Sequence, residues 1–235
     1  MENIANAKIH ILFYENADFP DSAFSCFSAL RKQKFLNCTN PKVKFQNAAA
    51  EFAVCAAMKN AGFPFAPPEY AYNGLEKPFM KNGFLSISHT DHAAACIVFS
   101  KPVGLDIEHE RRLNPLIAGR ILNRREFSAF IESKNRNDFL IRTWVAKESF
   151  LKLTGIGLRK GMRNIDFHPE ADSIFKEDGK KYAVSREKII LPSERYPDLT
   201  GAEGNYYICL CTEEPVETEL TVYNSFSDII DYLKG

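Results

Sequence analysis

Short segments of alternating apolar and polar residues run through this chain, interrupted by segments whose apolar residues recur at helical spacing. The alternation predicts strands at 8–14, 84–88, 94–99, 103–108 and 206–211. Helical spacing predicts helices at 24–34, 47–60, 116–132, 138–154 and 227–233, with Asn47 capping the second and Gly155 ending the fourth. Because strands and helices do not follow one another as regular βαβ units, we expect an α+β fold rather than a doubly wound sheet.

Composition excludes several classes of protein. The 235 residues include 30 Lys and Arg and 30 Asp and Glu, so no overall basic field points to nucleic acid as a partner. No apolar run approaches the ~18–20 residues that span a bilayer, and residues 1–11 lack the basic-then-apolar pattern of a signal peptide. We therefore expect a cytoplasmic protein that binds neither membrane nor nucleic acid.

The cysteines carry no metal-binding pattern. None of the six belongs to a C-x-x-C pair, and no histidine cluster shows zinc-finger spacing. Cys55 and Cys96 lie in apolar runs, as reduced cysteines that act as small hydrophobic residues do. We expect six reduced thiols in a reducing compartment.

The first candidate site is the predicted strand at 103–108. Side chains alternate faces along a strand, so Asp106 and Glu108 point the same way, with Cα atoms about 6–7 Å apart. Two carboxylates placed in this way suit a hard cation such as Mg²⁺, which prefers oxygen ligands. The solvated face of an edge strand would accept the same residues, so spacing alone leaves both interpretations open.

The second candidate site is the predicted helix at 138–154. Trp144 and Leu151 share an apolar stripe on this helix, and Glu148 projects into the same arc. A carboxylate among apolar neighbours needs a partner, a metal ion or a chemical role. The alternative is an ordinary i,i+4 pair of Glu148 with Lys152 on a solvated face.

A third set of candidates precedes both motifs. Ser88 and His89 end a predicted strand, where a hydroxyl and an imidazole suit a phosphate group. A single histidine at a strand end is more commonly only a turn residue. Lys77 and Pro78 form a turn whose lysine carries little information alone, because exposed lysines are common.

Together these residues resemble the signature of the 4′-phosphopantetheinyl transferases of the surfactin-synthetase-activating (Sfp) type. That family carries G-[IV]-D-[IV]-E followed by W-x-x-K-E-[SA]-x-x-K. Gly104–Glu108, with Leu105 at the second position, and Trp144–Lys152 correspond to the two in order and separation. Ser88-His89 and Lys77-Pro78 fall where the family has its S-H and K-P pairs. The resemblance covers residues 77–158.

The resemblance implies the 4′-phosphopantetheinyl transferase fold, in which two similar α/β lobes are related by pseudo-twofold symmetry. We expect an N-terminal lobe at 1–103 and a C-terminal lobe at 104–235 that carries the metal and catalytic motifs. The family resemblance also implies a monomer with its active site between the lobes.

The implied reaction transfers the phosphopantetheine arm of coenzyme A to a serine of an apo acyl or peptidyl carrier protein and releases 3′,5′-ADP. Mg²⁺ would be held by Asp106, Glu108 and Glu148, and Glu148 would also be the general base. Lys147 and Lys152 would contact the phosphates as further catalytic residues, with Lys152 favouring the leaving group. The implied coenzyme A contacts are Lys77, Pro78, Ser88, His89, Lys147 and Lys152.

The sequence departs from the family where a basic residue and a Thr or Arg open the helix that here begins near 47. Gln46 and Asn47 replace them, so another cation must meet the 3′-phosphate. Arg31, Lys32 and Lys44 are the candidates, and ordinary surface residues are the alternative for all three.

The segment at 116–127 suggests a docking surface, because carrier proteins are acidic around their modified serine. An amphipathic helix that packs its apolar side inward is the alternative. The residues concerned are Ile117, Ile121 and Leu122, with Arg120, Arg124 and Arg125.

Two other functions fit the motifs. One is a non-catalytic module that binds coenzyme A or a nucleotide, although Lys147, Glu148 and Lys152 are all present. The other is a Mg²⁺-dependent phosphodiesterase that uses the same three carboxylates, although further His or Asp ligands for a two-metal hydrolase are lacking.

Overall fold

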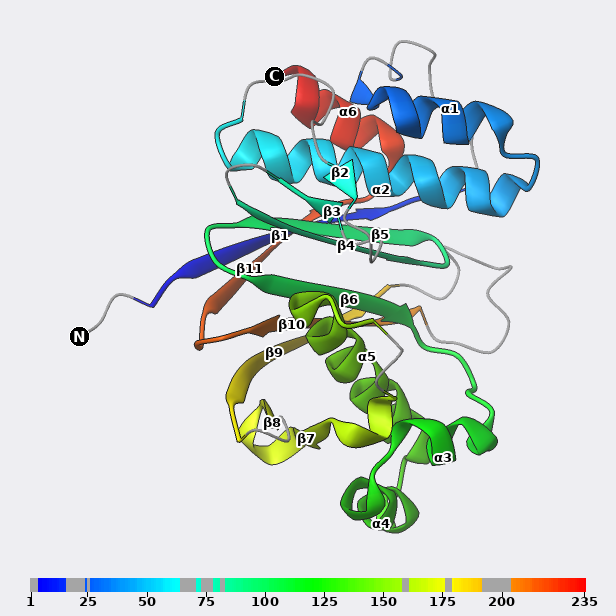
Figure 1. The fold of residues 1–235 in the computed structure, drawn as a ribbon. Coiled ribbons are helices and arrows are strands. Elements are labelled where there is room, and N and C mark those ends of the chain that lie inside the picture. The colour runs from blue at the N-terminus through cyan, green and yellow to red at the C-terminus, as the bar shows by residue number, and fades with distance from the viewer. Residues whose placement is uncertain are drawn as a thin grey trace. The chain divides into compact units, whose positions relative to one another are not determined.

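The computed structural model describes residues 4–15, 24, 26–63, 71–72, 78–80, 83–157, 161–175, 179–191 and 204–235. They form two compact units, each built around one long helix (Figure 1). The α2 unit, named after α2 (Pro41–Asn60), comprises Asn6–Lys101 and Thr218–Gly235. The α5 unit, named after α5 (Arg136–Thr154), comprises Pro102–Glu217 and the described N-terminal residues up to Ala5.

The α2 unit is a sheet with helices on one face. Its strand order is β11-β1-β5-β4, and α1, α2 and α6 cover the sheet (Figure 1). The core between them is rich in alanine and phenylalanine, which lets α2 lie close to the strands. The elements are β1 (Asn6–Phe13), α1 (Ala29–Asn37), β2 (Ala71–Tyr72), β3 (Pro78–Phe79), β4 (Phe84–Thr90), β5 (Ala93–Phe99), β11 (Glu217–Tyr223) and α6 (Phe226–Lys234).

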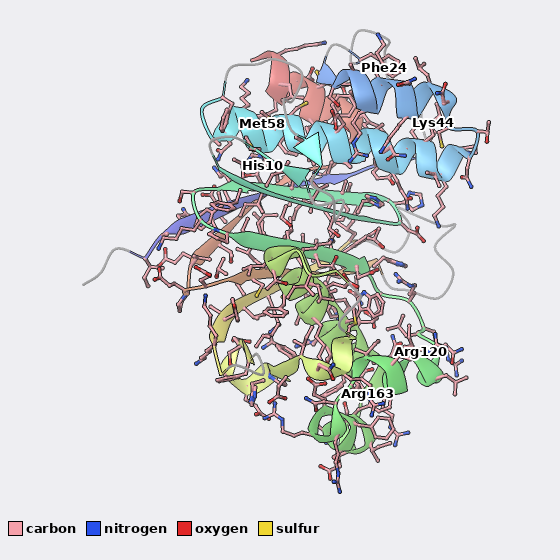
Figure 2. All side chains as sticks on the ribbon, in the orientation of Figure 1. His10, Phe24, Lys44, Met58, Arg120 and Arg163 are labelled. Atoms are coloured by element: carbon pink, nitrogen blue, oxygen red, sulfur yellow. The ribbon has the colours of Figure 1, made fainter. Side chains whose placement is uncertain are left out.

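The α5 unit packs α5 against a sheet of order β6-β10-β9-β8-β7, in which all four strand pairs are antiparallel. Side chains fill the layer between helix and sheet (Figure 2). The elements are β6 (Val103–His109), η2 (Pro115–Ile117), α3 (Ala118–Ile121), α4 (Arg124–Glu132), η4 (Met162–Asn164), β7 (Asp166–His168), η5 (Pro169–Ala171), β8 (Ser173–Phe175), β9 (Lys181–Ile190) and β10 (Asn205–Thr212).

The expected α+β class is confirmed, and the five expected strands appear as β1, β4, β5, β6 and β10. The expected division into 1–103 and 104–235 differs from the structure at the C-terminal end. The chain leaves the α2 unit close to Val103, as expected, but Thr218–Gly235 returns to it. β11 adds to the sheet beside β1, and α6 buries its apolar face in the core beneath α2.

Three helix boundaries differ from the sequence-based expectation. α2 starts at Pro41 with Asn40 as its cap, and the expected cap Asn47 lies inside the helix. The helix expected at 116–132 is divided into η2, α3 and α4, because Asn123 forms a capping box with Glu126 that starts a new helix. α1 begins five residues later than expected, after its cap Ser28.

The structure also describes the state of the cysteines and the hydropathy of the helices. All six cysteines are free, and five of them are buried. No helix in the described part of the chain combines the length and the apolar character that a membrane crossing requires.

Candidate active site

A strand and a helix of the α5 unit approach each other closely at Gly104 of β6. A Cβ atom at this position would lie 1.9 Å from the carbonyl oxygen of Ser149 and 2.4 Å from the amide nitrogen of Leu153, both in α5. Only glycine fits such a contact. Asp106 and Glu108 follow on the same face of β6, so the close approach sets their carboxylates beside α5.

Both carboxylates of β6 have partners, and two of those partners come from α5. Lys152 donates to Oδ1 of the buried Asp106 at 2.7 Å. The indole nitrogen of Trp144 donates to Oε1 of Glu108 at 3.1 Å, and the Arg111 guanidinium donates to Oε2 at 2.6 Å. The strand motif and the helix motif therefore meet in one cluster, which we call the carboxylate cluster: Asp106, Glu108, Glu148 and Lys152.

Glu148 completes this cluster as a group with an unusual proton affinity. Burial raises the pKa of its carboxyl to about 7, the negative charges of Asp106 and Glu108 act in the same direction, and Lys152 opposes them. Burial and the charge of Asp106 also raise the pKa of Glu108, against the opposing effect of Arg111. The charges of neighbouring carboxylates thus disfavour the ionised forms of Glu148 and Glu108, as happens where a cation or a proton belongs.

Lys147 does not belong to this cluster, which corrects the expectation that it contacts phosphate. Its side chain is fully buried, and Nζ donates to Glu126 at 2.5 Å and to the carbonyl oxygens of Ile121 at 2.9 Å and Met162 at 3.0 Å. Three acceptors use all three donors of an ammonium group. Lys147 therefore joins α5 to the segments beside it and has no donor left for a ligand.

The remaining predicted site residues lie in the α2 unit or outside the described residues. On β4, Ser88 is buried and His89 is exposed. Arg31 is mostly buried on α1, where its guanidinium donates to Asn47 at 3.0 Å and lies 3.5 Å from the buried carboxylate of Glu51. Lys77 is outside the described residues, and Pro78 is described only as part of the backbone of β3.

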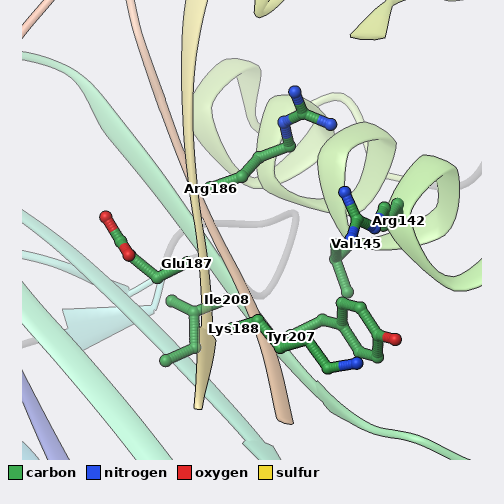
Figure 3. Close-up of a pocket in the computed structure, with 7 residues that line it drawn as sticks. All are labelled: Arg142, Val145, Arg186, Glu187, Lys188, Tyr207 and Ile208. Atoms are coloured by element: carbon green, nitrogen blue, oxygen red, sulfur yellow. The ribbon is translucent and has the colours of Figure 1, made fainter. Parts of the chain in front are cut away.

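A pocket of about 80 Å³ lies elsewhere in the α5 unit, between α5 and the strands β9 and β10 (Figure 3). Its cations already face acidic groups: Arg142 pairs with Asp138 at 2.8 Å, and Arg186 pairs with Asp172. No member of the carboxylate cluster lines it, so we place the chemistry at the cluster. The residues that line the pocket are Arg142, Val145, Arg186, Glu187, Lys188, Tyr207 and Ile208.

Comparison with known proteins agrees with the motifs. Residues 102–211 match the ACPS family, described as the 4′-phosphopantetheinyl transferase superfamily. The 4′-phosphopantetheinyl transferase ffp of Bacillus subtilis is 31% identical over 163 residues, which cover 67% of this chain and 66% of that protein. The chain belongs to the 4′-phosphopantetheinyl transferase superfamily.

One further relative and one solved structure are also similar to this chain. The 4′-phosphopantetheinyl transferase Sfp of Bacillus subtilis strain 168 is 31% identical over 155 residues, 65% of each chain. A solved holo-[acyl-carrier-protein] synthase from Thermotoga maritima aligns with 50% of this chain and 64% of that one, at 20% identity and a TM-score of 0.33, too low to support an argument. The matches span a little under two thirds of the curated relatives' length.

The donor chemistry of the carboxylate cluster fits the Mg²⁺ that transferases of this superfamily imply. Three carboxylates supply the hard oxygen ligands that this ion prefers. Among the described residues, however, no three His, Cys, Asp or Glu side chains are already gathered around one point as metal ligands. Asp106 and Glu108 instead bind Lys152 and Arg111, so an ion that takes the same carboxylate oxygens would have to displace these donors.

The superfamily signature led to Asp106, Glu108, Glu148 and Lys152, but sequence analysis missed two groups that hold Glu108. Trp144 was assigned only to an apolar stripe, although an indole N–H that becomes buried usually needs an acceptor. Arg111 lies three residues after Glu108 in the sequence and gave no signal of its own. Glu126, the partner of Lys147, could be found in the sequence only by its position three residues after Asn123, which is the spacing of a capping box.

Proposed function

We propose that this protein transfers the 4′-phosphopantetheine group of coenzyme A to a serine of an apo acyl or peptidyl carrier protein and releases 3′,5′-ADP. The observation that carries the proposal is the carboxylate cluster, in which Lys152 and Glu148 of α5 lie with the two carboxylates of β6. Membership of the superfamily supports the same reaction.

Asp106, Glu108 and Glu148 would hold Mg²⁺ in this proposal. The ion would neutralise charge on the pyrophosphate of coenzyme A. Lys152 donates to Asp106 in the free protein. Its half-exposed side chain is long enough to turn to the leaving phosphate once the carboxylate has another cation as partner.

Glu148 is the proposed general base. The serine oxygen attacks the phosphorus on the pantetheine side of the pyrophosphate, and the bond from that phosphorus to the oxygen of the 3′,5′-ADP leaving group breaks. The serine proton passes to Glu148, directly or through a water molecule. A carboxyl with a pKa of about 7 is a suitable acceptor near neutral pH, and binding of a cation would lower that value.

The proposed contacts with coenzyme A outside the cluster are Ser88, His89, Lys77 and Pro78. His89 is exposed at the end of β4, where its ring can reach a phosphate. The Arg31 guanidinium lies beside the buried carboxylate of Glu51. We propose that Arg31 has this structural role as the partner of Glu51 and does not bind the 3′-phosphate. In addition to His89, Lys32 or Lys44 then supplies charge for the 3′-phosphate.

A carrier protein would dock on α3 and α4, although with a different face from that suggested by the sequence. Ile121 and Leu122 are buried, and Arg125 is held by Asp166 and the carbonyl oxygen of Phe167. Apolar and basic side chains that remain exposed suit an acidic partner with an apolar contact. They are Leu116, Phe127, Ile131, Arg120 and Arg124, and Figure 2 shows Arg120 at the surface.

We also propose that the protein acts as a cytoplasmic monomer. Six free thiols fit a reducing compartment, because secreted domains commonly pair their cysteines. Sedimentation of the full chain would test the monomer, and a second copy in the sedimenting species would contradict it.

Product analysis separates the proposed reaction from its alternatives. Coenzyme A and Mg²⁺ are incubated with the protein, with and without an apo carrier protein, and the nucleotides are separated by chromatography. A transferase releases 3′,5′-ADP only when the carrier is present. Release without carrier would indicate a phosphodiesterase, and no release in either case would indicate a binding module; the comparisons support neither alternative.

A further inference from the structure

Glu108 is held by two donors that differ in kind. Trp144 donates to Oε1 from α5 at 3.1 Å, and Arg111 donates to Oε2 at 2.6 Å from the segment that follows β6. The Glu108 side chain is 18% exposed, whereas that of Arg111 is 45% exposed. The carboxylate is therefore fixed on one side by a packed indole and on the other by a side chain that can leave.

We infer that Arg111 is a displaceable counter-ion of Glu108, which holds this carboxylate in place in the metal-free protein and leaves when a divalent cation binds. The inference rests on the proposed function. It assigns to Arg111 a positioning role for the reaction that the superfamily signature does not include, since Arg111 lies outside both motifs.

The geometry favours the exchange. Mg²⁺ binds carboxylate oxygens at about 2.0–2.1 Å, and the Arg111 donor already lies 2.6 Å from Oε2. A cation and a guanidinium cannot share that position without strong repulsion. The hydrogen bond of Trp144 goes to the other oxygen, so it can persist and keep Glu108 oriented.

The exchange also links the cation to the anionic substrate. A guanidinium released from Glu108 remains charged and can bind a phosphate in a bidentate manner. Arg111 would therefore weaken cation binding to the free protein, whereas in the presence of coenzyme A it would gain a new partner. A divalent cation and the pyrophosphate would then each favour binding of the other.

The test uses the indole as a reporter. Trp144 is the only tryptophan of the chain, so its fluorescence reports directly on the environment of Glu108. The full chain, freed of metal, is titrated with Mn²⁺ or Mg²⁺ in the absence of coenzyme A, and the same titration is followed by calorimetry. Wild type is compared with Arg111→Gln, and with Arg112→Gln as a matched control that removes the neighbouring exposed charge.

We expect Arg111→Gln to bind the cation about 3–10-fold more tightly than Arg112→Gln in the free protein, because a half-exposed ion pair opposes binding only modestly. With coenzyme A present the advantage should disappear or reverse. Arg111→Lys, which keeps the charge but loses the fork of donors, should lie between the two. Equal affinities of Arg111→Gln and Arg112→Gln, or weaker binding by Arg111→Gln, would overturn the inference.

The carrier assay keeps the two claims apart. If wild type transfers phosphopantetheine but Arg111→Gln binds the cation no better than Arg112→Gln, only the counter-ion role is wrong. If wild type neither binds a divalent cation nor modifies a carrier protein, the proposed function itself fails.

Discussion

At the scale of single residues, Glu148 is the group whose environment has the clearest measurable consequence. Its pKa of about 7 in the metal-free protein exceeds the ordinary value of 4.5, so the fold favours the protonated carboxyl. The stability associated with that proton is complete below the unfolded pKa and is lost as pH rises towards and through about 7.

We therefore predict that Glu148→Gln is more stable than wild type at pH 8 in EDTA, by on the order of 1 kcal/mol after allowance for partial exposure. At pH 4.5 the two proteins should be nearly equal, because the wild-type carboxyl is protonated there. Urea denaturation at both pH values measures the difference. A difference that does not change with pH would contradict the raised pKa.

His89 allows a second prediction at the same scale. If its exposed ring binds the 3′-phosphate, His89→Ala should weaken binding of coenzyme A by about 1.5–3 kcal/mol, the usual value of a hydrogen bond to a charged group. Binding of dephospho-coenzyme A, which lacks that phosphate, should change little. Calorimetry with both ligands tests the assignment, and equal losses would move His89 to another role.

Sequence reasoning could locate most of the cluster because the family signature includes its residues. Asp106 and Glu108 follow Gly104 at alternate positions on one strand face, and Glu148 and Lys152 lie one helical turn apart. It could not distinguish Lys147 from these residues. Lys147 is adjacent to Glu148 in the sequence but points to a different side of α5. The partners on that side come from distant segments of the chain.

At the scale of elements, the buried pair of Lys147 and Glu126 determines how α5 is joined to α4, η4 and β7. Glu126 accepts hydrogen bonds from the backbone nitrogens of Asn123 and Phe167. Lys147 donates hydrogen bonds to the carbonyl oxygens of Ile121 and Met162. Because the pair is buried, loss of one partner leaves an uncompensated charge.

We predict that Lys147→Met lowers the free energy of unfolding by about 3–5 kcal/mol. Lys147→Met with Glu126→Gln should recover part of the loss, because the amide carries no charge and can still accept a backbone hydrogen bond. Urea denaturation gives the stabilities, and calorimetry gives the affinity for coenzyme A. If the double variant is stable but binds coenzyme A much more weakly than wild type, Lys147 has a role in phosphate binding after all.

The prediction of one helix at 116–132 was wrong for a reason that also lies in the joining of elements. Its apolar spacing continues across Leu122 and Asn123, so periodicity alone gives no break. The break comes from the reciprocal bonds of Asn123 and Glu126, whose side chains satisfy the first amide groups of α4. A capping box inside an amphipathic segment is formed by polar side chains, so a pattern of hydrophobic residues does not reveal it.

At the scale of the whole molecule, nothing in the sequence of 218–235 indicates that this segment belongs to the α2 unit. The residue pattern of α6 indicates only that the helix has an apolar face, on which Phe226, Ile229 and Leu233 are buried. Which core receives that face depends on β11, which joins the sheet beside β1 more than two hundred residues earlier in the chain. Contacts between segments so distant in sequence leave no local pattern.

Recognition of a second protein is also a property of the whole molecule. We predict that Arg120→Glu with Arg124→Glu raises the KM for an acidic carrier protein several-fold and leaves the affinity for coenzyme A unchanged. The effect should diminish in added salt, as interactions between exposed charges do. Arg163→Glu, which reverses an exposed charge on η4, is the control, and equal effects of both changes would place the docking surface elsewhere.

The most direct measurement is the intact mass of an apo carrier protein over time with coenzyme A, saturating Mg²⁺ and either wild type or Glu148→Gln. The account predicts that wild type adds one phosphopantetheine group to the carrier. It also predicts that Glu148→Gln does so about 10²–10⁴-fold more slowly, the usual contribution of a general base. A carrier whose mass does not change with wild type would contradict the proposed transfer, and an equal rate with Glu148→Gln would contradict the role of the carboxylate cluster.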